Sequence, residues 1–131
     1  GEAARLSSIR AADEGFQKAT FGLNDASQGT DKTPHFFVLV AGSPVNLRAN
    51  AKVAPIGSNL TISMDKSTDQ SVTWAAFTDT PLTIPIASTL IHVSTSFVTN
   101  ASLSVGDLLR INIPQGDSLG AAEEIEVVLK W

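Results

Sequence analysis

Alternation of apolar and polar residues is the feature that most constrains how this chain can fold. In "VNLRANAKV", residues 45–53, apolar side chains take every second position, and "NLTISMD", residues 59–65, repeats the pattern. A period of two places the apolar side chains on one face of a β-strand and the polar ones on the other. Between the two segments, Pro55-Ile56-Gly57 predicts a turn, in which proline fixes φ and glycine is free to take a positive φ.

The same period continues along most of the chain. Further strands are expected at "HFFVLV" (35–40), "SVTWAAF" (71–77), "LTIPIAS" (82–88), "TLIHVSTSF" (89–97), "LLRINI" (108–113) and "EEIEVVLKW" (123–131). Turn signals separate them at intervals of about 8–12 residues, which is typical of an antiparallel sandwich or barrel. We therefore expect an all-β fold, a jelly-roll-like antiparallel β-sandwich of about eight strands.

The alternation also predicts which side chains face the core. We expect Leu109, Ile111 and Ile113 to point inward from one strand, and Ile125, Val127 and Leu129 from the last. In residues 89–97, the pattern places Ile91, Val93 and Phe97 on the inward side. Pro85 should confine its segment to a sheet edge, because proline cannot donate to the ladder.

The first 32 residues have a different character. They are rich in Ala, Ser, Asp and Gly. Leu6, Ile9 and Phe16 could line a short helix, but Gly15 and Gly22 interrupt it, which leaves a helical turn near residues 3–12. We expect an N-terminal arm at 1–32, or a frayed terminus, followed by a sandwich domain at 33–131. The apolar residues of the arm are candidate contacts with this domain, a sister subunit or a partner: Leu6, Ile9, Phe16, Phe21 and Leu23.

Composition excludes several classes of partner. The formal charge is −4, and the 9 Lys and Arg residues are scattered rather than clustered, which argues against nucleic acid. No apolar run approaches the length that spans a bilayer, so no membrane partner is expected. The absence of cysteine excludes disulfides, cysteine-based metal sites and thiol catalysis.

No pattern of catalytic residues stands out. His35 and His92 are the only histidines, neither lies in a recognisable motif, and a surface position explains each. Asp65, Ser67 and Asp69 occupy alternate positions, like part of an EF-hand loop, but the glycine and the distal glutamate are missing. We expect no enzyme activity, no cofactor and no metal.

Several short motifs recur here in an order that is shared with one protein family. They are "APIGS" at 54–58, Leu60 to Lys66, "LTIPIAS" at 82–88, "LSVGDLL" at 103–109 and Ile111 to Ser118. In this order they resemble the β-sandwich module of bacteriophage virion proteins, found in head decoration, head-fibre and tail-fibre components. Two departures are "STDQ" where the family has an "NGT" hairpin, and "GDSLGA" where it has a "GS" pair.

The resemblance implies a structural role and supplies no catalytic residues. It implies a virion protein assembled in the host bacterial cytoplasm, with the major capsid protein or another virion protein as partner, and a homotrimer as the oligomeric state. A sandwich that closes on Trp131 behind an arm favours a capsid decoration (cement) or head-fibre protein. The alternative is a tail-fibre or receptor-binding module that recognises a host surface glycan or protein.

Overall fold

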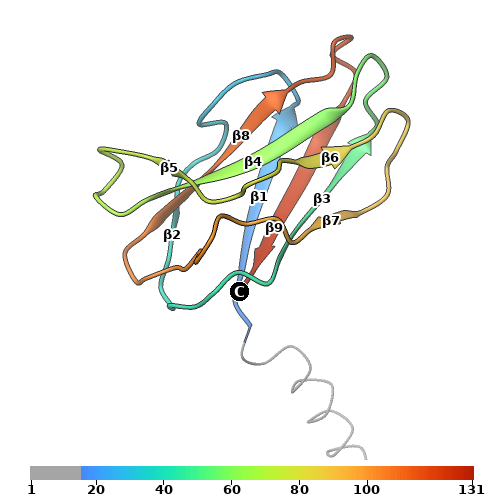
Figure 1. The fold of residues 1–131 in the computed structure, drawn as a ribbon. Coiled ribbons are helices and arrows are strands. Elements are labelled where there is room, and N and C mark those ends of the chain that lie inside the picture. Colours follow the sequence, from blue (N-terminus) through green and yellow to red (C-terminus); the bar gives the residue numbers. More distant parts are fainter. Residues whose placement is uncertain (1–15) are drawn as a thin grey trace, which may run out of the picture.

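The computed structural model describes residues 16–131, and this part of the chain is all-β, without a helix. Its strands are β1 (Lys18–Asp25), β2 (Phe36–Phe37), β3 (Asn46–Val53), β4 (Leu60–Ser67), β5 (Ala75–Ala76), β6 (Leu82–Ile84), β7 (His92–Ser94), β8 (Leu108–Gln115) and β9 (Glu123–Lys130). They form two antiparallel sheets packed face to face (Figure 1). The expected β-sandwich is confirmed, with nine strands in place of about eight.

The two sheets interleave segments that are distant in sequence. The four-stranded sheet has the order β1-β9-β3-β7, and the five-stranded sheet has the order β2-β8-β4-β5, with β6 also paired to β4. The consecutive strands β3 and β4 therefore lie in different sheets. The turn at Pro55-Ile56-Gly57 carries the chain from one sheet to the other, and it is not the tip of a hairpin.

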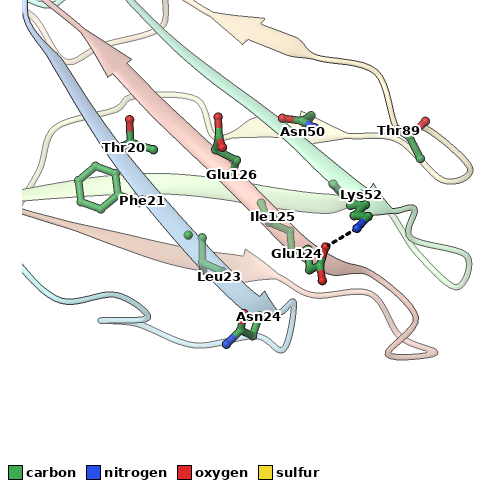
Figure 2. Close-up of a pocket in the computed structure, with 12 residues that line it drawn as sticks. Thr20, Phe21, Leu23, Asn24, Asn50, Lys52, Thr89, Glu124, Ile125 and Glu126 are labelled. Carbon is green, nitrogen blue, oxygen red and sulfur yellow. Dashed lines mark ion pairs between the residues drawn. The ribbon is translucent and has the colours of Figure 1, made fainter.

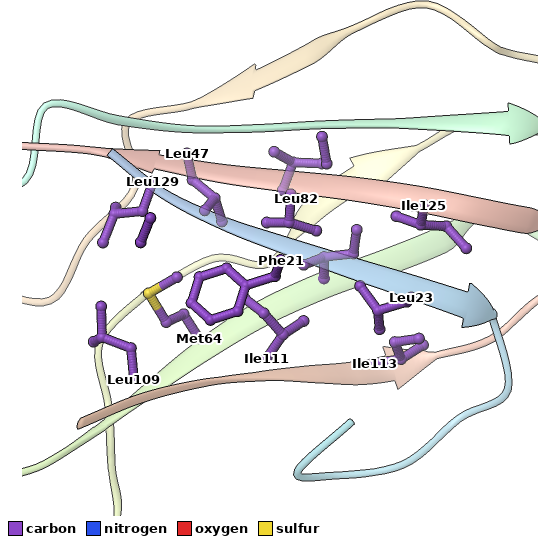
Figure 3. Packing of buried hydrophobic residues seen from close by; sticks show 14 of the residues in the cluster. Phe21, Leu23, Leu47, Met64, Leu82, Leu109, Ile111, Ile113, Ile125 and Leu129 are labelled. Atoms are coloured by element: carbon purple, nitrogen blue, oxygen red, sulfur yellow. The ribbon is translucent and has the colours of Figure 1, made fainter. Parts of the chain in front are cut away.

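The core lies between the sheets and uses the alternation directly. Leu47 of β3 and Leu129 of β9 are opposite each other in the ladder, and both are fully buried. Ile62 and Met64 of β4 are fully buried as well. Figure 3 shows side chains of both sheets meeting in one cluster, with Phe21 at its centre. Burying an aliphatic side chain of this size contributes about 1.5–3 kcal/mol, so these strands supply most of the driving force for folding.

The expected boundary between arm and sandwich is wrong for residues 18–32. Lys18–Asp25 form β1, which pairs along its length with β9. Phe21 and Leu23 are only 4% and 5% exposed, so they belong to the core of this domain. Further on, Gly29 bridges to Ile113 in β8. The expected helix at 3–12 and the residues Leu6 and Ile9 lie outside the described residues.

The structure also reverses the expected orientation of β7. Ile91 and Val93 are 63% and 57% exposed, and only Phe97 of the three expected inward residues packs against the core. The ladder places Val93 opposite Arg48, whose neighbours Leu47 and Ala49 are the buried residues of β3. The segment does form a strand, but its apolar row faces outward.

Two expected strands are much shorter than their apolar runs. Only Phe36–Phe37 pair within residues 35–40, and only Ala75–Ala76 pair within 71–77. Strand β6 ends at Ile84, directly before Pro85, and pairs only with β4, as the proline predicts. The short strands leave several large apolar side chains on the surface, among them Phe37, Leu39 and Val72.

Candidate interaction surfaces

One buried carboxylate holds the turn between the sheets in place. Asp117 is 7% exposed and accepts hydrogen bonds of 2.7 to 3.3 Å from the backbone N–H groups of Ile56, Gly57, Leu119, Ala121 and Ala122. Burial alone would raise its pKa, but the donors led by the Gly57 N–H outweigh burial and hold the pKa of Asp117 well below its usual range. Asp117 therefore ties residues 56–57 to the loop before β9.

Gly57 is required in this turn for space and not for a positive φ. The positive-φ glycines of residues 16–131 are Gly106 and Gly120. A Cβ on Gly57 would lie 2.6 Å from the Leu119 backbone nitrogen and would also clash with the Ser118 hydroxyl. The expectation that Gly57 is needed for a positive φ is therefore wrong. The turn is a structural crossing between the two sheets.

The outer face of the five-stranded sheet carries a polar network. Asp65 on β4 accepts hydrogen bonds from Arg110 Nε at 3.0 Å and from Asn112 Nδ2 at 2.7 Å, both on β8. The Trp74 ring stacks on the Arg110 guanidinium, with 4.4 Å from Cζ to the ring centroid. His35 meets the edge of Trp74 at 4.8 Å between centroids. The charges of Arg110 and Asp65 are thus matched within the chain.

The groups considered for chemistry are used in local structure. Asp69 accepts hydrogen bonds from Thr73, which hold its pKa below the usual value, so it closes its own loop and does not join Asp65. Within residues 16–131, no three potential metal ligands of the His, Cys, Asp or Glu type lie together. His92 Nε2 lies 2.7 Å from Ser88 Oγ, which also accepts the Leu90 N–H and so closes a loop.

One wide hollow of the described surface is shallow, and its lining is about equally polar and apolar. It has a volume of about 710 Å³ and lies on the outer face of the four-stranded sheet, where Gly22 has no side chain to fill it. Figure 2 shows its lining from β1, β9 and β3, with the Lys52–Glu124 ion pair of 3.3 Å at one end. Few convergent groups surround it, so it does not resemble an enclosed ligand pocket.

A cluster of exposed apolar residues lies at one end of the sandwich. Phe37, Leu39, Val40 and Val105 are 52%, 72%, 46% and 64% exposed, and we refer to these four residues as the apolar end. Backbone hydrogen bonds of 2.9 Å, from Val38 N to Asp107 O and from Gly106 N to Val38 O, bring the two segments side by side. Exposed apolar side chains on adjoining segments can mark an interaction surface.

The apolar end is anchored by the buried Trp131 at the C-terminus of the described chain. Trp131 is 6% exposed, and its Nε1 donates to the Val40 carbonyl at 2.8 Å. A Cβ on Gly42 would lie 2.8 Å from the Trp131 ring, so the chain passes directly across the indole. Figure 1 shows this end, where the C-terminus lies beside the start of β1.

The predicted contact residues fall into three groups. Leu6 and Ile9 lie outside the described residues, and Phe21 and Leu23 are part of the core. Phe16 is 40% exposed and lies under the Lys130 ammonium, 4.1 Å from its ring centroid. Sequence reasoning missed the apolar end because "HFFVLV" was interpreted as a strand. The sequence carries no signal for it, because residues 36–40 are apolar throughout.

Comparison with known proteins identifies the fold class. No protein-family model and no curated protein sequence matches the chain. Among solved structures, the capsid of Ralstonia phage GP4 is similar, with a TM-score of 0.51 and 12% identity, over 89% of this chain and 83% of that one. Eiger TNF from S. frugiperda has a TM-score of 0.47 at 12% identity, over 88% of this chain and 92% of that one.

Murine APRIL gives a TM-score of 0.42 at 8% identity, over 88% of this chain and all of that chain. At these identities the likenesses concern the fold. The chain is an antiparallel β-sandwich of a kind that also occurs in a phage capsid. Residues 16–131 hold no helix that is long and apolar enough to cross a membrane.

Proposed function

We propose that this chain is a non-enzymatic structural protein of a bacteriophage virion. In this proposal it is a capsid decoration or head-fibre protein, which binds the capsid surface as a homo-oligomer, with a trimer as the expected state. The observation that carries the proposal is the apolar end, a group of large apolar side chains that the sandwich leaves exposed to solvent. The fold similarity to the capsid of Ralstonia phage GP4 supports the proposed place in a phage virion.

Each chain offers only a small contact area at the apolar end. A symmetric oligomer can present several copies of such a surface to a symmetric lattice at once. The second and later contacts are then intramolecular, so avidity exceeds the affinity of a single chain by a large factor. Residues before Phe16 are proposed to add contact area.

Capsid binding tests the proposal directly. Shells assembled from the major capsid protein of the same phage should co-sediment with the purified full chain. Leu39→Asp and Val105→Asp should each weaken binding by about tenfold or more, because a charge would be buried in an apolar contact. Val72→Asp is the matched control, since Val72 is 79% exposed and belongs to the β4–β5 loop.

The outcomes separate the alternatives. Binding that is unaffected by both variants at the apolar end would contradict this assignment of the surface. Saturable binding to host cells, without any binding to shells, would favour a tail-fibre or receptor-binding module instead.

A further inference from the structure

We propose that a second surface, on the four-stranded sheet, is the contact between copies of this chain. It consists of Arg48, Ile91, Val93, Glu126 and Val128 and is called the β3 face here. The inference deepens the proposed function, which needs an oligomer, by naming a surface through which two copies pair. A self-complementary contact joins copies in twos, so it favours a dimer, or an assembly of dimers, over the expected trimer.

The ladder register gathers these side chains on the solvent side of the sheet. Arg48 is opposite Val128 on β9 and opposite Val93 on β7. Asn50, two residues further along β3, is opposite Glu126. Leu47, Ala49 and Ala51 are buried. Arg48 and Asn50 alternate with them along β3, so their side chains project outward.

The β3 face is more apolar than a solvated sheet face requires. Ile91 and Val93 are both more than half exposed. A small hollow of about 120 Å³ opens between Ile91, Val128 and the stems of Arg48 and Glu126. In β7 the apolar side chains point to solvent, although such side chains are normally buried when sheets pack. A partner that covers this surface would bury them.

The polar groups of the β3 face are incompletely paired. Arg48 Nε is buried and has no hydrogen-bond acceptor among the described residues, and Asn46 Oδ1 beside it has no donor. Neither Arg48 nor Glu126 forms an ion pair within residues 16–131. The Arg48 guanidinium and the Glu126 carboxylate are therefore both free to pair with another molecule. They lie on the adjacent strands β3 and β9, two residues apart in register.

This charge pattern identifies the occupant as another copy of the chain. When two copies of one surface meet about a two-fold axis, residue i of one copy contacts residue j of the other, and j contacts i. Glu126 of each copy can then lie against Arg48 of its neighbour, with Ile91 and Val93 beside the charged pair. The surface is complementary to itself, whereas a partner of a single charge sign would match only half of it.

The contact is expected to be face to face. The sheet edge next to the β3 face is β7, which has only three residues, and a short edge strand is a poor template for strand addition. The β3 face also leaves the apolar end uncovered, since the two surfaces share no residue. One assembly can therefore associate through the β3 face and bind a shell through the apolar end.

Sedimentation velocity on the full chain tests the proposal without a capsid. The wild type should sediment as a species heavier than the 13.7 kDa chain. Val93→Asp should sediment as a single chain, and Val72→Asp, the same change at an exposed site elsewhere, should behave as wild type. Circular dichroism should show both variants folded, because Val93 and Val72 are both on the surface.

A charge swap gives a second, independent readout. Arg48→Glu and Glu126→Arg should each dissociate the assembly, because like charges then face each other in every contact. Mixing the two variants should restore association, since the carboxylate introduced at position 48 of one chain can pair with the guanidinium introduced at position 126 of the other.

Three results would overturn the proposal: a wild type that sediments as a single chain, equal behaviour of Val93→Asp and Val72→Asp, or a mixture that remains dissociated. Failure here would leave capsid binding by the apolar end standing. A chain that associates as expected but does not bind shells would overturn only the proposed function.

Discussion

Asp117 shows how one residue can stabilise a crossing between two sheets. Its carboxylate is held ionised by backbone donors, so its pKa in the folded chain is lower than the ordinary value of 3.8. A depressed folded pKa contributes stability that is present above the unfolded pKa and is lost as the pH falls toward the folded pKa. Asp25, whose pKa the Ser27 hydroxyl and N–H lower to about 2, acts in the same direction.

We therefore expect the urea midpoint of the wild type to fall as the pH drops from about 4 to about 2. Asp117→Asn should lower the midpoint at pH 7 and flatten this pH dependence, because the amide cannot ionise and its NH₂ group faces backbone donors. Asp79→Asn is the control, since the exposed Asp79 carboxylate accepts no hydrogen bond within the described chain. An unchanged pH slope in Asp117→Asn would contradict this role.

Gly57 provides a second prediction about a single residue. Gly57→Ala should destabilise the fold by about 1–3 kcal/mol, because the new Cβ meets the Leu119 backbone, which cannot move without breaking the Asp117 hydrogen bonds. Gly22→Ala is the matched change, since open space surrounds its Cβ position. In a strand it should be neutral or stabilising by about 0.5–1 kcal/mol. Equal unfolding midpoints for the two variants would refute the steric argument.

At the scale of elements, Trp74 couples the loop before β5 to strand β8. Its stacking on Arg110 should contribute about 0.5–1 kcal/mol at this partly exposed site. A double-mutant cycle with Trp74→Ala and Arg110→Ala, measured by urea unfolding, should return a coupling energy of that size. Trp74→Ala combined with Lys52→Ala should be additive, because Lys52 belongs to the other sheet. Additivity in the Arg110 cycle would show that the stack is not stabilising.

The long strands β3, β4, β8 and β9 could be predicted from the sequence because each buries one full face. Alternation alone, however, shows which side chains share a face and not which face is buried. That is why β7 was predicted as a strand but with the wrong side inward. Whether Val93 points to the core or to solvent depends on its ladder partner Arg48, which is far away in the sequence.

Strand β1 illustrates the opposite error. Ala19, Phe21 and Leu23 do alternate with Lys18 and other polar or small residues, but the surrounding glycine and alanine content suggested an arm. Its burial depends on β9, the last strand of the chain. The apolar end could not be predicted either, because it forms only where Val38 and Asp107 meet through the backbone.

At the scale of the whole molecule, the position of β1 determines how any N-terminal contribution must be tested. Strand β1 closes one edge of the four-stranded sheet and supplies Phe21 and Leu23 to the core. A deletion that reaches residue 30 removes a complete strand and exposes one side of β9. Its effect on binding would report unfolding and not the loss of a contact.

We expect deletion of residues 2–15 to leave a folded sandwich, with a urea midpoint close to that of the full chain. Deletion of residues 2–30 should abolish cooperative unfolding, because removal of Phe21 alone costs about 3–5 kcal/mol in a core, comparable with the whole stability of many small domains. Phe21→Ala in the full chain is the matched substitution and should lower the midpoint strongly. Phe16→Ala should change it little, since Phe16 is 40% exposed. A cooperatively folded 2–30 deletion would show that β1 is dispensable, and the sandwich would then begin near residue 33, as the sequence alone suggested.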